Sequence, residues 1–163
     1  VCINNHMNDT QFAFIHVEKT AGWSIRQASH RCRRIFYHGH RPITEQIDRD
    51  YTTVSVLRDP VDRYISWIKW IYRFRDFKDD KNLLMERCIN NIESHRTYQD
   101  YYFKEYKPDI MLSFDNIQAD WSQFVYDHQL CDVDITLPWR HNTRIPELTK
   151  SQRCMLTKIL SRI

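Results

Sequence analysis

Residues 16–24 combine side chains and a chain position that suit an anion. The segment reads HVEKTAGWS and lies where an apolar run gives way to helical periodicity. A helix amino terminus offers unpaired N–H groups and a partial positive charge, which attract phosphate or sulfate. Lys19 adds a full charge, and Thr20 and Ser24 add hydroxyl donors. Gly22, one of only two glycines, lets the backbone approach an anion closely.

This loop differs from the phosphate loop of nucleotide kinases. The GxxxxGK[ST] pattern is absent, because Lys19 precedes Gly22 instead of following it. An ordinary strand–helix turn with a surface lysine would have the same composition, so that alternative stays open. Trp23 is expected to pack against the protein more than to contact a ligand.

A second candidate anion site follows the β-branched run at residues 52–57. Arg58 ends this run, and Ser66 lies about two turns into the helix that follows. In open α/β sheets the carboxyl ends of neighbouring strands share one ligand crevice. Arg58 could bind a phosphate bidentately there, and Ser66 could donate a hydroxyl bond. The alternative is that Arg58 pairs with Asp62 while Ser66 faces solvent.

Strand and helix patterns alternate along the chain. Strands are expected at 12–17, 34–37, 52–57 and 109–114. Helices are expected from the loop to about residue 33, from Asp59-Pro60 to about 74, and at 83–92, 98–106, 119–130 and from about 149, with a turn at 76–82 and a loop at 131–147. This order predicts an α/β fold with a mostly parallel central sheet flanked by helices.

Length and composition indicate a single domain, residues 1–163. The chain is 42% hydrophobic and 28% charged, which excludes a disordered or collagen-like protein. No run of about 18 apolar residues is present, so nothing here is expected to span a bilayer. Because the chain begins with Val1, we expect its natural amino terminus to be incomplete, and any membrane anchor to lie in a segment outside this chain.

Net charge and cysteine content limit which ligands and metals the chain could bind. A net charge of +3 and a pI near 8.6 are compatible with an anionic ligand but too low for a nucleic-acid-binding arm. The five cysteines are widely spaced without a CxxC pair, and no zinc-ligand or di-carboxylate spacing occurs, so we expect no metal. An odd number leaves at least one thiol unpaired within the chain, and it leaves the redox compartment open.

Two motifs together resemble a known family. KTAGWS after one strand and RDPVDRYIS after another, in this order, resemble the P-loop-like sulfotransferase fold of the Golgi carbohydrate enzymes. Between them, residues 36–40 (FYHGH) are similar to a segment of the heparan sulfate and uronyl 2-O-sulfotransferases. The resemblance covers roughly residues 12–75, with a weaker echo at 109–130 and 139–150. Trp23 departs from the family, which has a small hydroxyl residue there.

The resemblance implies a donor and its binding residues. The donor would be 3′-phosphoadenosine 5′-phosphosulfate (PAPS), used without a metal. Arg58 and Ser66, eight positions apart, would hold its 3′-phosphate. The phosphosulfate would be held by the loop residues Lys19, Thr20, Ala21, Gly22, Trp23 and Ser24, and the nucleotide would be covered by a basic loop containing Arg140, Asn142 and Thr143.

The resemblance also implies the catalytic roles. Lys19 would stabilise the leaving phosphate oxygen, and a histidine of the FYHGH segment would act as the base. We favour His40 as the base and His38 as its orienting neighbour or a substrate contact. His16 is expected to be a satisfied core or near-loop residue.

The expected function is therefore sulfuryl transfer from PAPS to a carbohydrate hydroxyl, with the 2-O type favoured. The acceptor would be a polysaccharide or glycan such as a glycosaminoglycan, and nucleic acid is not an expected partner. The Golgi lumen is the compartment that the family suggests, although a soluble viral or microbial enzyme fits equally. The alternatives are a P-loop-type phosphotransferase and a non-catalytic relative that binds nucleotide or glycan. The presence of His38 and His40 argues against loss of the base.

Overall fold

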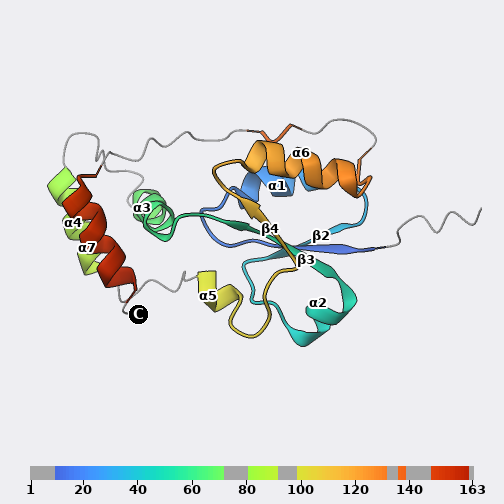
Figure 1. Ribbon diagram of the computed structural model, residues 1–163, viewed down its shortest axis with the longest axis horizontal. Coiled ribbons are helices and arrows are strands. Elements are labelled where there is room, and N and C mark those ends of the chain that lie inside the picture. Colours follow the sequence, from blue (N-terminus) through green and yellow to red (C-terminus); the bar gives the residue numbers. More distant parts are fainter. Residues whose placement is uncertain (1–9, 72–80, 92–98, 132–135, 139–147, 162–163) are drawn as a thin grey trace, which may run out of the picture.

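The computed structural model describes residues 10–71, 81–91, 99–131, 136–138 and 148–161. Its centre is a four-stranded, all-parallel sheet in the order β2-β1-β3-β4 (Figure 1). The strands are β1 (Phe12–Ile15), β2 (Ile35–Gly39), β3 (Thr52–Leu57) and β4 (Ile110–Ser113). The expected α/β fold with a parallel sheet flanked by helices is confirmed, and in this sheet the first strand pairs with the third.

Helices surround the sheet in three groups (Figure 1). On one face lie α1 (Gly22–Ser29) and α6 (Ile117–Asp127), and on the other lie the short helices α2 (Glu45–Asp50) and α5 (Gln99–Tyr102). Beyond the carboxyl ends of the strands, α3 (Pro60–Ile71), α4 (Lys81–Asn90) and α7 (Lys150–Leu160) pack together. Each group buries its own cluster of apolar side chains.

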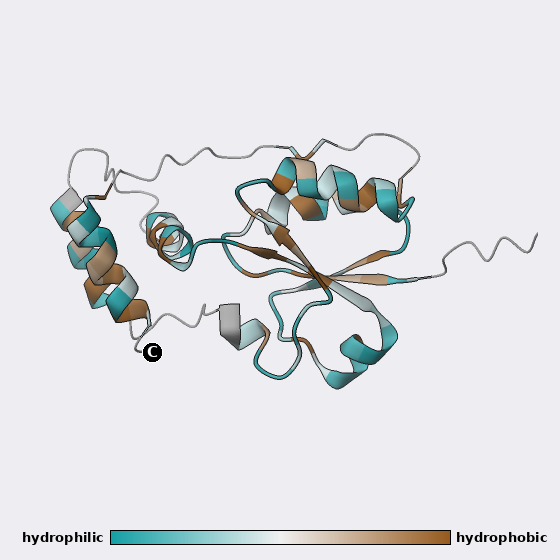
Figure 2. Cartoon of the chain, in the orientation of Figure 1, coloured by the Kyte–Doolittle hydropathy of each residue, from teal (hydrophilic) through white to brown (hydrophobic). Residues whose placement is uncertain are grey.

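The central strands explain why the sheet is covered on both faces. All four residues of β1 (FAFI) are buried, the pattern of a parallel strand enclosed by helices. Phe12 and Phe14 pack with α1 and α6, whereas Ala13 and Ile15 face the cluster of Ile43 and α5. Figure 2 shows largely brown, apolar strands in the middle of the sheet, between helices that carry both teal and brown residues.

Side-chain caps fix the starts of α3 and α7. The Asp59 carboxylate accepts the backbone N–H of Asp62 at 2.9 Å, as expected for a helix that begins with Pro60. Thr149 forms a capping box with Gln152 at the start of α7. These caps satisfy backbone donors that the first helical turn leaves unpaired.

Several boundaries differ from the expected ones. Helix α2 was not expected, although Thr44 caps it and Glu45 and Asp48 occupy its first turn. Helix α1 ends at Ser29, not near residue 33, and Arg34 then adopts a left-handed backbone with φ of 63°. The expected helix at 98–106 is reduced to the single turn of α5. Residues 76–80 of the expected turn and most of the loop at 131–147 lie outside the described residues.

A disulfide joins the two helices of one face. Cys32, just after α1, is bonded to Cys131, just after α6, across 99 positions of sequence. Cys88 is a buried free thiol and Cys154 an exposed one. Among the described helices, none combines the length and the apolar character that crossing a bilayer requires.

Candidate anion-binding site

The Lys19 loop and Arg58 meet where the sheet changes direction. From β1 the chain crosses to β2 on one side, and from β3 it crosses to β4 on the other, so the switch point lies between β1 and β3. Lys19 follows β1, and Arg58 follows β3. Arg58 Nη1 donates a hydrogen bond of 2.8 Å to the main-chain oxygen of Lys19. The two expected anion sites therefore lie together at the switch point, and we refer to this place as the crevice, since open α/β sheets bind ligands there.

The loop between β1 and α1 has a strained backbone. Lys19 and Ala21 adopt left-handed conformations with φ of 64° and 63°. Such conformations are unfavourable for residues with a Cβ and occur mainly where function requires them. The fully buried Thr20 between them donates its hydroxyl to the Val17 oxygen at 2.7 Å, which anchors the turn. A tight turn of this kind can gather backbone N–H groups into a concavity for an anion.

Gly22 has a structural role that the sequence did not reveal. A Cβ at Gly22 would overlap the imidazole ring of His16, which lies directly against the first turn of α1. The glycine therefore makes room for a neighbouring side chain, and the close approach of an anion at Gly22 stays a prediction. This contact fixes the position of the helix start relative to the end of β1.

The two loop hydroxyls donate to protein carbonyls. Thr20 bonds to Val17, and the Ser24 hydroxyl donates to the Pro138 oxygen at 2.7 Å. Each hydroxyl has one proton, so neither can donate to an anion while these bonds persist. An anion at this loop would meet the backbone N–H groups at the start of α1 and the charge of Lys19. Donation by Thr20 or Ser24 would require its bond to be exchanged.

The two cations at the crevice are partly desolvated. Burial is the main cause that lowers the pKa of Lys19, and repulsion by Arg58 lowers it further, while Glu18 acts in the opposite direction. Burial also lowers the pKa of Arg58, against the opposing effect of nearby aspartates led by Asp62. A bound anion would compensate both effects, because it would replace lost hydration with an opposite charge.

Aromatic rings flank both cations. The Arg58 guanidinium lies over Phe114, with its central carbon 4.0 Å from the ring centroid. Lys19 Nζ lies 5.8 Å from the ring centroid of the half-exposed Trp70. Both contacts are within the range of cation–π attraction. They hold the two side chains at the carboxyl ends of β1 and β3.

Helix α7 reaches the start of α3 next to Arg58. The Arg153 guanidinium binds Asp62 at 2.7 Å and Asp59 at 3.0 Å. These two carboxylates are among the charges that partly offset the lowering of the Arg58 pKa by burial. Arg153 and Arg58 therefore both interact with the negative charge of Asp59 and Asp62.

Ser66 faces the interior of the molecule. Only 7% of it is exposed on α3, so the alternative in which Ser66 faces solvent is wrong. Its neighbours along the helix, Arg63, Tyr64 and Ile65, are buried as well. The position is compatible with the expected hydroxyl donor at the inner end of the crevice.

The two histidines of the FYHGH segment lie in different surroundings. Gly39 between them adopts a left-handed backbone with φ of 79° and ends β2. His38 Nε2 donates to the Pro42 oxygen at 3.0 Å. The exposed His40 donates from Nδ1 to the His16 oxygen at 3.1 Å. Because a carbonyl can only accept, this bond places a proton on His40 Nδ1, and in a neutral imidazole Nε2 is then the acceptor.

His16 contacts His40, which sequence reasoning missed. It lies one residue beyond β1, 9% exposed, and its ring centroid is 3.9 Å from that of His40. Its Nδ1 is hydrogen-bonded to the Tyr37 hydroxyl. Burial, followed by repulsion from His40, Lys19 and Arg26, lowers the pKa of His16 to about 3. The register of β1 with β2 brings these rings together, and no local motif signals it.

The other expected site residues cannot be placed. Arg140, Asn142 and Thr143 lie outside the described residues, so their covering of a nucleotide stays a prediction. Within the described ranges, no group of three or more histidine, cysteine or acidic side chains is arranged to hold a metal ion.

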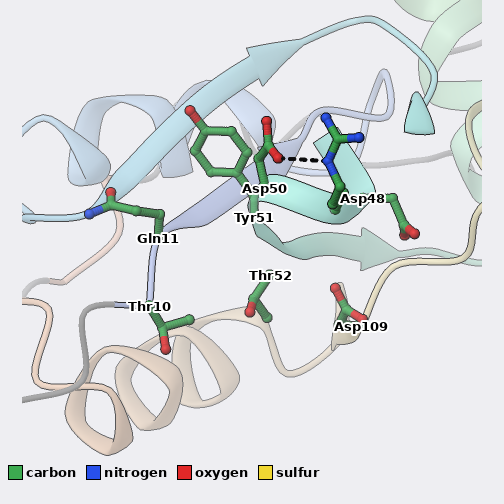
Figure 3. Close-up of a pocket in the computed structure, with 8 residues that line it drawn as sticks. Thr10, Gln11, Asp48, Asp50, Tyr51, Thr52 and Asp109 are labelled. Atoms are coloured by element: carbon green, nitrogen blue, oxygen red, sulfur yellow. Dashed lines mark hydrogen bonds and ion pairs between the residues drawn. The ribbon is translucent and has the colours of Figure 1, made fainter. Parts of the chain in front are cut away.

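A shallow polar cavity of about 410 Å³ lies at the amino ends of the strands, away from the Lys19 crevice (Figure 3). Arg49 and Asp50 form an ion pair at its rim, at 3.2 Å. Asp109 accepts hydrogen bonds from the backbone and hydroxyl of Thr53, so it fixes the start of β4. The remaining lining residues are Thr10, Gln11, Asp48, Tyr51 and Thr52.

Comparison of the chain with protein-family models, with curated proteins and with solved structures finds no match in any of the three.

Proposed function

We propose that this protein is a PAPS-dependent sulfotransferase that moves a sulfuryl group to a carbohydrate hydroxyl. One observation carries the proposal: Arg58 donates to the Lys19 carbonyl at the switch point of the sheet. Two motifs 39 positions apart thereby contribute cations to a single crevice. PAPS carries anionic groups at the 3′ and the 5′ positions of its ribose, and two adjacent cationic strand ends suit that distribution of charge.

The residues at the crevice fall into two sets, one for the 5′-phosphosulfate and one for the 3′-phosphate of PAPS. The start of α1 and Lys19 would hold the phosphosulfate through the backbone N–H groups of the first helical turn and a partly desolvated ammonium. Arg58 and the buried Ser66 would hold the 3′-phosphate. These protein groups suit an anion and not a metal ion, because they are backbone N–H groups, a hydroxyl and two cationic side chains.

Charge along the chain favours this edge of the sheet for anionic ligands. Residues 19–44 contain no aspartate or glutamate, although the whole chain has 21 acidic residues. This acid-free segment runs from the Lys19 loop through α1 and β2 to the segment after His40. Within this segment Lys19 follows β1 and Arg41 follows β2, so both lie at the carboxyl ends of the strands, where their charge would attract the donor.

His40 is suited to accept the proton of the acceptor. With its own proton donated from Nδ1 to the His16 oxygen, Nε2 presents a lone pair. The acceptor oxygen would form a bond to sulfur while the bond between sulfur and the bridging phosphate oxygen breaks. The acceptor proton would pass to Nε2 of His40, and Lys19 would neutralise the charge left on the phosphate. The 2-O position of a sugar is the acceptor that the FYHGH resemblance favours.

Two measurements test this function. Radiolabelled sulfate transfer from PAPS to a panel of desulfated glycosaminoglycans and neutral polysaccharides should label at least one carbohydrate. The His40→Ala variant should lose transfer by about 10²–10⁴-fold, the usual contribution of a general base. The same variant should keep its thermal stabilisation by 3′,5′-ADP.

The alternatives predict different ligand responses. A P-loop phosphotransferase would be stabilised by ATP–Mg²⁺ in a thermal shift assay, whereas we expect stabilisation by 3′,5′-ADP only. A non-catalytic relative would be stabilised by 3′,5′-ADP but would label no glycan. Absence of stabilisation by 3′,5′-ADP at millimolar concentration would contradict the proposed donor.

A further inference from the structure

We propose that His16 is a positioning residue for His40: its main-chain oxygen selects the tautomer, and its buried side chain holds the ring in the one orientation that keeps this bond. The inference rests on the proposed function for its catalytic consequence, but its structural content concerns His40 alone. Sequence reasoning assigned His16 to the core, and the sulfuryl transfer step makes no use of it. Its contacts show a second role.

His16 touches His40 in two ways. The main-chain oxygen of His16 accepts the Nδ1 proton of His40 at 3.1 Å. The two rings pack at 3.9 Å between centroids, with 37° between their planes. A hydrogen bond alone leaves an exposed imidazole free to rotate about it. The ring contact removes that freedom, so Nε2 of His40 keeps one direction.

His16 is itself held on several sides. Tyr37 on β2 is hydrogen-bonded to its Nδ1, and Gly22 on α1 closes the space beside the ring. Its backbone N–H donates to the Gly39 oxygen at 3.1 Å, which ties the end of β1 to the end of β2. Because His16 follows β1 and contacts both β2 and α1, its side chain can serve as a rigid support for the exposed His40.

The charge state of His16 suits this role. The groups that face it are His40, Lys19 and Arg26, all bases, and the hydroxyl of Tyr37. Burial and these bases keep His16 neutral, and burial raises the pKa of Tyr37, so the pair carries no charge at neutral pH. A neutral support does not oppose the positive charge that His40 gains when it accepts a proton.

The test separates positioning from packing by use of the contact between His16 and Gly22. In His16→Ala the ring is lost and a cavity forms, whereas Gly22→Ala alone forces the ring out of place. The double variant His16→Ala/Gly22→Ala places a methyl group in the vacated space. We expect the double variant to recover most of the stability lost in each single variant, without recovering the orientation of His40.

Two readouts report on His40 in these variants. Nitrogen-15 NMR of the imidazole should show the Nδ1–H tautomer in the wild type and a mixture of tautomers in the double variant. The kcat for sulfuryl transfer should fall at least tenfold in the double variant, with the KM for PAPS within about twofold of the wild type. His16→Phe keeps a ring against His40 and should retain a kcat severalfold above that of the double variant.

The outcomes distinguish the two proposals. An unchanged His40 tautomer together with an unchanged kcat in a folded double variant would overturn the positioning role while leaving the sulfotransferase intact. A His40 tautomer that changes with His16, in a protein that transfers no sulfate, would support the positioning role and contradict the proposed function. If the double variant does not fold, Tyr37→Phe provides the same NMR comparison, since it releases His16 without removing a ring. Its failure to alter the His40 tautomer would then contradict the proposal.

Discussion

The substitution Arg58→Met removes the guanidinium that joins the ends of β1 and β3. Methionine keeps an unbranched apolar stem, so the change mainly deletes the hydrogen bond to Lys19 and the contact over Phe114. The variant should be less stable than the wild type, and the Lys19 loop should lose its link to β3. The pKa of Lys19 should rise, because repulsion by Arg58 is one cause of its lowered value.

The magnitude follows from the two deleted contacts. A hydrogen bond from a charged donor contributes about 1.5–3 kcal/mol, and a cation–π contact contributes about 0.5–2 kcal/mol. Arg58 is partly exposed and repels Lys19, and both facts reduce the net effect. We therefore expect the free energy of unfolding to fall by about 2 kcal/mol, near the lower end of the combined range.

Urea denaturation with a matched control measures this loss. Arg49→Met makes the same change in charge on an exposed side chain whose ion pair with Asp50 is a surface pair. Such pairs contribute about 0–1 kcal/mol, so the control should lose less than Arg58→Met. Equal losses in the two variants would refute the view that Arg58 links the two strand ends.

Three further predictions concern the disulfide, α7 and pH. Replacing Cys32 and Cys131 with serine should lower the free energy of unfolding by up to about 4.7 kcal/mol, since the disulfide closes a loop of about 100 residues. A reducing agent should cause the same loss in the wild type and no loss in this variant. Arg153→Gln should weaken 3′,5′-ADP binding severalfold in calorimetry, because the two aspartates at the start of α3 would then act on Arg58 without their other partner. The wild type should lose stability relative to His16→Phe as the pH falls from 6.5 to about 3, because in this range His16 binds a proton in the unfolded chain but not in the folded one. Above pH 6.5 the difference in stability between the two proteins should not change with pH.

Local sequence patterns predicted the elements but not their contacts. The apolar run of β1 and the Asp59-Pro60 start of α3 were recognisable, because burial and capping depend on a few neighbouring residues. Helix α2 was missed, although Thr44 followed by acidic residues is a capping signal. Its six residues were too few to show a helical period.

The composition of the site was also easier to predict than its geometry. Lys19 and Arg58 could be assigned to one crevice, because parallel neighbouring strands end on the same side of a sheet. The Ser24 hydroxyl bond depends on the distant Pro138, and the contact of His16 with His40 depends on the register of β1 with β2, so no local pattern encodes either.

The most direct test of the central claim is a calorimetric cycle with two ligands and two proteins. 3′,5′-ADP and 5′-AMP differ only in the 3′-phosphate that Arg58 is proposed to hold. Wild-type protein should bind 3′,5′-ADP at least tenfold more tightly than 5′-AMP, and Arg58→Met should bind the two ligands with nearly equal Kd values. An equal preference for 3′,5′-ADP in both proteins, or no preference in the wild type, would contradict the claim that the ends of β1 and β3 form one binding site for this donor.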